Sequence, residues 1–189
     1  HMVVANPPYL GGKGMNELLQ EYAKAYFVEG KSDLFAMFML RAMAMVIPDG
    51  FVSMINMQSW MFLGSYENLR SKLLSESLIE TMAHLGERAF DSIGGAVVST
   101  SAFVLRKSPP PDAEGIFVRL VSGENEAEKS AALLLAAKDR KHPLRFSASS
   151  DTFEMIPGKP IAYWVSDSLA DSFSDSTRLL DLARPCQGM

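Results

Sequence analysis

Four residues near the start of the chain, Asn6-Pro7-Pro8-Tyr9, constrain its fold more than any other segment. They directly follow Val3-Val4-Ala5, an apolar run that is typical of the end of a buried strand. The two prolines exclude a helix or a central strand at this point and hold the backbone extended. Open α/β sheets bind their ligands just outside the carboxyl ends of their strands, so this turn is a candidate site.

Segments with helix and strand patterns alternate after this turn. Apolar residues repeat every three to four positions in the expected helices and form short continuous runs in the expected strands. Helices are expected over Met15–Val28, from Ser32 or Asp33 to about Val46, and near Tyr66–Ser75, and strands over Phe51–Met57, Leu78–Leu85 and Ala96–Leu105. This order predicts an α/β fold with a mostly parallel sheet and helices on its faces.

A proline-rich break, Ser108-Pro109-Pro110-Pro111-Asp112, separates this part from the rest of the chain. After the break we expect a strand over Gly115–Ser122 and a helix over Glu124–Lys138. The segment Ser147–Ser176 is rich in serine and aspartate, which predicts an irregular connector with one apolar island at Ile161–Val165. The part beyond the break is therefore expected to be a small α+β extension.

Composition excludes several classes of site and partner. The 189 residues include 18 basic and 22 acidic side chains, and this net charge of −4 gives no hint of a nucleic-acid partner. Cys186 is the single cysteine and there are three scattered histidines, so we expect no disulfide and no metal site. The most apolar stretch, Leu34–Ile47, is interrupted by Arg41 and is too short to cross a membrane. We expect a cytoplasmic protein.

The chemistry of the turn follows from its residue types. Pro7 and Pro8 have no amide hydrogen, so the Asn6 side-chain oxygen and the Pro7 carbonyl can point at one spot as two acceptors. A planar amine that donates two hydrogens fits this pair, and the Tyr9 ring offers a face on which a flat ring can stack. The acceptors stabilise the positive charge that develops as the amine nitrogen attacks, without a strong base.

At these residues the chain resembles the amino-group DNA methyltransferases of the Asn-Pro-Pro-Tyr adenine type, which use S-adenosylmethionine. It is most similar to the large adenine methylases of BREX phage-defence systems and to Eco57I-like restriction–modification enzymes. The resemblance covers Val3 to about Lys107 and continues more weakly to the end. Further segments that carry it are Asp33-Leu34-Phe35, 47–51, 89–93, 97–106 and 156–164.

The resemblance implies a catalytic site made of Asn6, Pro7, Pro8 and Tyr9. In this family an adenine is flipped out of double-stranded DNA, stacks on the tyrosine and donates its exocyclic amine hydrogens to the asparagine and the first proline. The amine then attacks the methyl group of the cofactor in line. Flipping costs a few kcal/mol, which stacking in the pocket must offset.

The family's Gly-rich cofactor loop precedes the Asn-Pro-Pro-Tyr segment, and here Gly11-Gly12-Lys13-Gly14 follows it and lacks phosphate-loop spacing. We therefore expect the C-terminal half of a Rossmann-like methyltransferase sheet, inactive and without S-adenosylmethionine on its own. The expected parts are a partial catalytic domain over 1–107, a strand–helix connector over 108–145, and the start of the region leading to target recognition over 146–189. An uncovered sheet edge and apolar faces predict self-association.

Two further groups of residues are candidates for contacts with substrate. Asn56, Gln58 and Trp60 follow the strand expected at 51–57 and are candidates to contact the target base or DNA, although an ordinary strand-to-helix turn explains them equally well. Lys138, Arg140 and Lys141 belong to the densest basic cluster and are candidates for DNA phosphate contacts. A solvated helix end with cations near its carboxyl terminus is the more common explanation of such a cluster.

Two other functions are compatible with the same motif. A protein glutamine methyltransferase acts on a planar side-chain amide, which also fits the acceptor pair, but such enzymes usually end soon after the sheet closes. A folded recognition or assembly module with an inactive motif is the non-enzymatic alternative, against which the intact Asn6 and Tyr9 argue.

Overall fold

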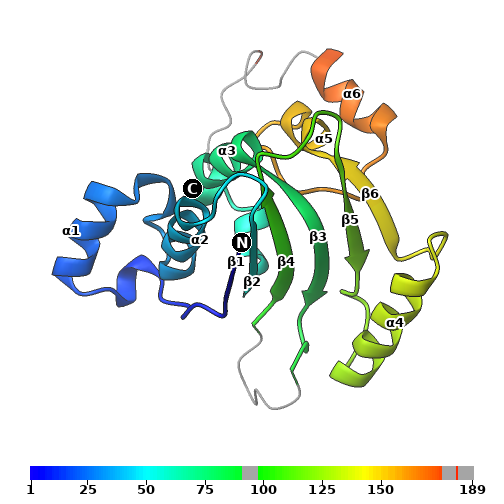
Figure 1. Cartoon of the computed structure of the whole chain (residues 1–189), viewed down its shortest axis with the longest axis horizontal. Helices are drawn as coiled ribbons and strands as arrows, with labels where there is room; N and C mark the ends of the chain where they lie inside the picture. The colour runs from blue at the N-terminus through cyan, green and yellow to red at the C-terminus, as the bar shows by residue number, and fades with distance from the viewer. Residues whose placement is uncertain (91–97, 176–181, 183–189) are drawn as a thin grey trace.

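The computed structural model describes residues 1–90, 98–175 and 182. Six strands form one sheet in the spatial order β1-β2-β4-β3-β5-β6 (Figure 1). Their bounds are Met2–Ala5 (β1), Phe51–Met57 (β2), Ser77–Gly86 (β3), Thr100–Lys107 (β4), Glu114–Arg119 (β5) and Arg145–Ser149 (β6). The expected strands are thus present, while Cys186 and residues 91–97, which include the predicted start of the fourth strand, lie outside the described residues.

The sheet is mixed, so the prediction of a mostly parallel sheet is wrong. β1 pairs with β2 and β3 pairs with β5 in parallel, whereas β4 runs antiparallel to both of its neighbours and β6 antiparallel to β5. A parallel connection requires a crossover, usually a helix. The sequence between β3 and β4 has no helical apolar repeat that predicts a crossover helix, and these two consecutive strands pair antiparallel.

Helices cover both faces of the sheet, as predicted. They are Glu17–Tyr26 (α1), Leu34–Met45 (α2), Glu67–Glu76 (α3), Glu126–Lys138 (α4), Ser150–Met155 (α5) and Asp167–Asp175 (α6). The main core joins one face of the sheet to α2, α3 and α5. α4 packs on the other face, through Ala136 against Val118 and Leu120. No helix of the described part is long and apolar enough to span a bilayer.

The prediction of an irregular connector over Ser147–Ser176 is wrong for much of that segment. It contains the end of β6 together with α5 and α6. Its apolar island enters the main core, where Ile161 is 0% and Tyr163 2% exposed. Serine and aspartate dominate the composition, but the few apolar side chains are spaced to face the sheet, and their burial orders the segment.

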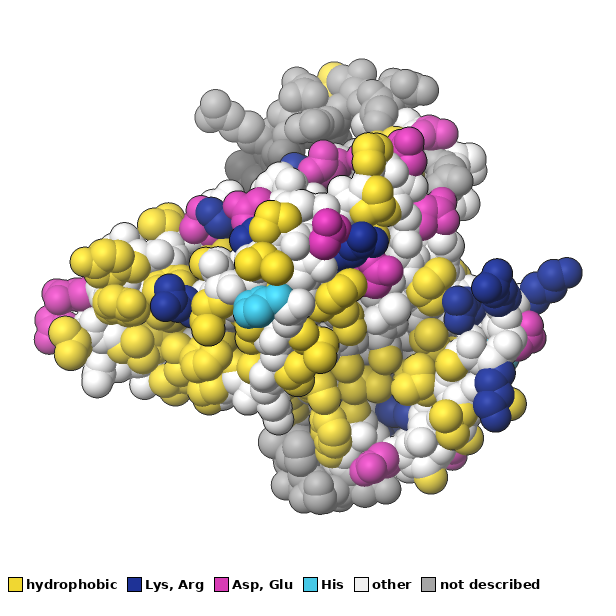
Figure 2. Space-filling model, viewed as in Figure 1, with side chains coloured by type: hydrophobic (Ala, Val, Ile, Leu, Met, Phe, Trp, Pro, Cys, Tyr) yellow, Lys and Arg dark blue, Asp and Glu magenta, His cyan; other side chains and the backbone are white. Residues whose placement is uncertain are grey.

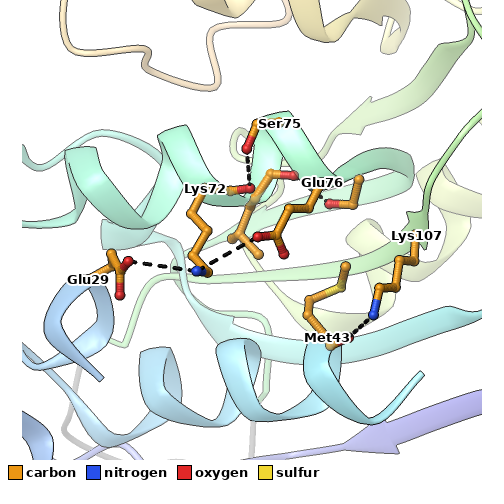
Figure 3. A network of polar contacts seen from close by, with 8 residues as sticks. Glu29, Met43, Lys72, Ser75, Glu76 and Lys107 are labelled. Atoms are coloured by element: carbon orange, nitrogen blue, oxygen red, sulfur yellow. Dashed lines mark hydrogen bonds and ion pairs between the residues drawn. The ribbon is translucent and has the colours of Figure 1, made fainter. Parts of the chain in front are cut away.

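Polar contacts fix α2, the second α-helix after the Asn-Pro-Pro-Tyr turn. Lys107, at the end of β4, donates from Nζ to the carbonyls of Met43 and Val46, both at 2.9 Å, and so satisfies the carboxyl end of α2. Lys72 on α3 pairs with Glu29, just before α2, and with Glu76 (Figure 3). The carboxyl end of α2 is thereby tied to the sheet, and the segment before α2 is tied to α3.

The face of the sheet that carries α4 is covered only in part. Beside α4 lies a hollow of about 310 Å³ whose lining includes Ser53, Ala83, Val104 and Leu133. In Figure 2, which has the orientation of Figure 1, hydrophobic side chains spread across the lower half of the molecule. An uncovered apolar surface favours association, so we continue to expect that this chain self-associates.

Candidate functional site

The Asn-Pro-Pro-Tyr turn lies at the carboxyl edge of the sheet. β1 ends at Ala5, which is in register with Met54 of the parallel strand β2, and the turn begins at the next residue. Asn6 is exposed, whereas Pro7 beside it is buried. The buried proline anchors the turn and leaves the asparagine accessible from solvent, as a substrate-binding acceptor requires.

Two contacts hold the Tyr9 side chain, one at its hydroxyl and one at its ring. Its hydroxyl donates to the Ile55 carbonyl of β2 at 3.2 Å, and its ring packs edge-on against Phe35, with centroids 6.0 Å apart and planes at 83°. Burial raises the pKa of the Tyr9 phenol, and the negative charge of Asp33 raises it further. The phenol is therefore a neutral donor at physiological pH, and its contacts fix the orientation of the ring.

Asp33 connects the end of the turn to the start of α2. Its side chain is 6% exposed, and Oδ1 accepts from the backbone amides of Leu10 at 3.0 Å and Phe35 at 3.2 Å. The second bond caps the helix, while the first holds the residue that follows Tyr9. A reciprocal backbone bond from Leu34 to the Leu10 carbonyl completes the connection. The sequence predicts the cap but not its bond to the turn.

The three candidates that follow β2 have different environments. Asn56 is 0% exposed, and its Oδ1 has no hydrogen-bond partner. Trp60 is 1% exposed, donates from its indole to Ser101 Oγ at 3.2 Å and packs on Phe103. The structure therefore places both inside the core, on the face that carries α2 and α3. Gln58 is half-buried at the same carboxyl edge of the sheet.

Gln58 is the end of a chain of three hydrogen-bonded side chains. His84 Nε2 lies 2.7 Å from Gln58 Oε1, and His84 Nδ1 lies 2.9 Å from the Tyr163 hydroxyl. Burial lowers the pKa of His84 to about 4, with smaller contributions from the positive charges of Arg119 and Lys129. Burial raises the pKa of Tyr163. The phenol therefore donates to neutral His84, whose Nε2–H donates to Gln58 and fixes the orientation of its amide.

The sequence alone gives no reason to connect His84 to Gln58 or Tyr163. Gln58 and Tyr163 are 26 and 79 positions from His84 in the chain, and only the folded structure brings the three side chains together. Across the sheet, Asn56 is in register with Ser101, Ser101 with His84, and His84 with Arg119. No local pattern in the sequence signals this row of side chains.

An aromatic cluster adjoins this row. The guanidinium of Arg119 lies 5.1 Å from the ring centroid of Trp164, a cation–π geometry. Trp164 packs edge-on against Tyr163 and stacks at 25° on His84. The indole is 38% exposed, so part of this cluster is open to solvent at the carboxyl edge.

The basic residues Lys138, Arg140 and Lys141 are exposed at the end of α4. β1 and β6 are the two edges of the sheet, and α4 leads into β6, so this cluster lies across the sheet from Asn6 (Figure 1). The structure does not bring it together with the turn.

Neither a metal ion nor a cofactor phosphate has a fitting site among the residues described. Within the described ranges no three histidine, cysteine, aspartate or glutamate side chains are arranged to hold a metal ion. The Gly11–Gly14 loop does not fit as a cofactor loop, because the Gly12 amide donates to the Ser32 carbonyl and the Gly14 amide to the Gly11 carbonyl. The Gly12 and Gly14 amides are thus used within the protein.

The fold and the placement of the turn define the class of protein. The same fold is present in the methyltransferase subunit of a type I restriction–modification system from Streptococcus thermophilus. That match has a TM-score of 0.56 and 19% identity, and it covers 84% of this chain and 36% of that chain. The chain has the α/β fold of S-adenosylmethionine-dependent methyltransferases.

Residues 1–90 match the Eco57I restriction-modification methylase family, and this part of the chain is an Eco57I-like methylase domain. The adenine-specific methyltransferase BrxX of Escherichia coli O9:H4 (strain HS) is 48% identical over 171 residues, or 90% of this chain. The adenine-specific methyltransferase PglX of Lacticaseibacillus casei (strain Zhang) is 38% identical over 98% of it. The chain spans 14% and 16% of the length of these relatives. The resemblance predicted from the sequence is confirmed.

Proposed function

We propose that this chain is the base-holding part of a DNA adenine methyltransferase that marks host DNA in a restriction–modification or phage-defence system. The observation that carries the proposal is the turn itself: an exposed Asn6 and a rigid Pro7 at the carboxyl edge of a methyltransferase sheet. Its family, and relatives that are named adenine-specific methyltransferases, support adenine as the target.

The chemistry assigned to the turn concerns the exocyclic amine of adenine. The Asn6 side-chain oxygen and the Pro7 carbonyl accept its two hydrogens, which draws the nitrogen lone pair out of conjugation with the ring and stabilises positive charge on the nitrogen. Tyr9 holds the base by stacking, and its hydroxyl bond to Ile55 together with its edge-on contact with Phe35 keeps the side chain in place. S-adenosylmethionine supplies the methyl group in the complete enzyme.

The complete enzyme is larger than this chain, as the 14% and 16% coverage of its relatives indicates. The described residues include no free glycine-rich loop that fits the cofactor, so we expect this chain alone to be inactive. In calorimetry it is expected to bind no S-adenosylmethionine at micromolar concentration. Micromolar binding would show that the chain has its own cofactor pocket.

Methylation of a protein glutamine is the competing activity of the same acceptor pair. The experiment that separates the two uses the full-length protein with S-adenosylmethionine labelled in the methyl group, duplex DNA and a mixture of bacterial proteins. We expect label in N6-methyladenine of the DNA. Label recovered in protein glutamine, with none in DNA, would replace the proposed substrate.

A further inference from the structure

A second polar surface lies beside the Asn-Pro-Pro-Tyr turn, and the function described so far does not use it. It is a hollow of about 410 Å³, here called the lysine hollow, lined by Gly12, Lys13, Gln20, Lys24, Lys31 and Ser32. Its three lysines come from three different segments: the short helix at Gly12–Gly14, α1, and the residues before α2.

The three ammonium groups form no ion pair in the part of the chain that the structure describes. Among residues 1–90, 98–175 and 182, neither Lys13, Lys24 nor Lys31 takes part in an ion pair, and all three are exposed. Among the acidic residues of this region, Glu29 is paired with Lys72 and Asp33 accepts from two backbone amides, while Glu17 and Glu21 on α1 form no ion pair with the three lysines. The three lysines place like charges around one hollow, and an anion bound there would offset their mutual repulsion.

The rim of the lysine hollow is held in place before any ligand binds. Gln20 Nε2 donates to the carbonyls of Gly12 at 3.0 Å and Met15 at 2.9 Å, which ties the short helix to α1. The Gly12 amide donates to the Ser32 carbonyl at 3.0 Å, which ties it to the start of α2. Because these contacts fix the backbone, binding an anion requires ordering only of the lysine side chains.

The position of the hollow indicates which anion it takes. Lys13 is four residues from Tyr9, so their Cα atoms are at most about 14 Å apart. Asp33 holds the intervening backbone at Leu10. A base that stacks on Tyr9 after rotating out of a duplex carries its own flanking phosphates within this range, and those phosphates must be held while the base is extruded. Lysine is a common ligand of such phosphates.

We propose that the lysine hollow binds phosphates of the DNA strand that carries the target adenine. The proposal rests on the function proposed above and adds a second contact to it, next to the base. It also chooses between two basic surfaces, because the cluster at the end of α4 lies across the sheet from the turn.

The test measures DNA affinity of the full-length protein as a function of salt concentration. The variant K13Q/K24Q/K31Q is compared with wild type, with R41Q as a control for loss of an exposed cation on α2, and with K138Q/R140Q/K141Q as the competing surface. Each phosphate contact contributes about 0.9 to the slope of log affinity against log salt. We expect the slope to fall by roughly 2 to 3 in the hollow variant, equally for target and non-target duplexes.

A second arm locates the contact on the DNA. Replacing the phosphates beside the target adenine by neutral methylphosphonates is expected to weaken binding by wild type at least tenfold and to leave binding by the hollow variant nearly unchanged. If the triple variant does not fold, the single variants K13Q, K24Q and K31Q are each expected to lower the slope by about 1.

An unchanged slope in the hollow variant overturns the proposal, as does a fall confined to the α4 variant. A methylphosphonate effect of equal size in wild type and the hollow variant also overturns it. These failures are distinct from failure of the proposed function, which is read from methyl transfer to DNA by the wild-type protein.

Discussion

Replacement of Asp33 by alanine tests whether the Asn-Pro-Pro-Tyr turn is fixed by the start of α2. The change removes the acceptor of the Phe35 amide, a helix cap worth about 1 kcal/mol. It also leaves the partly buried Leu10 amide without its partner, at a cost of about 1–2 kcal/mol. We therefore expect a loss of about 2–3 kcal/mol, which corresponds to a melting temperature lower by roughly 5–10 °C for a domain of this size.

The assay is urea and thermal unfolding of this chain, followed by circular dichroism. Asn16→Ala is the matched control, because Asn16 caps α1 by accepting from Leu19 and makes no bond to the turn. It is expected to cost about 1 kcal/mol. Asp33→Asn keeps an acceptor oxygen and is expected to cost less than about 1 kcal/mol. If Asp33→Ala costs no more than Asn16→Ala, the bond to Leu10 does not hold the turn.

Two further predictions concern buried groups at the carboxyl edge of the sheet. The pKa of His84 is about 4 in the folded protein, below its unfolded value of 6.5, so the unfolded state binds more protons between these values. Stability is expected to fall by up to roughly 3 kcal/mol as pH decreases from 6.5 to 4, and urea titrations of His84→Asn should show a flatter dependence over this window. Lys129→Met removes the donor to the Leu85 and Leu120 carbonyls and is expected to cost about 2–3 kcal/mol in the same assay at pH 7. Lys138→Met, at an exposed position of the same helix, is expected to stay within about 0.5 kcal/mol of wild type, and equal costs for the two would contradict a role for the buried ammonium.

Much of the fold is predictable because local patterns decide it. The run Phe51–Met57 coincides with β2, and the apolar repeats locate α1 to within two residues at each end. Strand direction is not a local property. The sequence therefore predicts the strand β4 but not its antiparallel direction. The burial of Tyr163 depends on the sheet face that receives it, and a serine-rich composition gives no sign of that face.

The same distinction holds for the candidate site: its contiguous motif is predictable from the sequence, and its contacts between distant segments are not. Asn6-Pro7-Pro8-Tyr9 is predictable because the motif and the strand before it are contiguous. Asn56 is inside the core because the alternation of β2 places it on the same face as Val52 and Met54, both buried. The sequence of this run is apolar on both faces, so it does not indicate which face is buried. The contacts of Asp33 with the turn and of His84 with Gln58 join segments far apart in the chain.

The role of Asn6 is tested most directly by single-turnover methyl transfer with the full-length protein, saturated with DNA and S-adenosylmethionine. Asn6→Ala removes one of the two acceptors for the adenine amine, and Asn68→Ala, at an exposed position of α3, is the matched control. Loss of one preorganised acceptor is expected to slow transfer about 100-fold or more, with DNA affinity within threefold of wild type and the control unchanged. A rate for Asn6→Ala within threefold of wild type would contradict the assignment and leave the turn with a binding role alone.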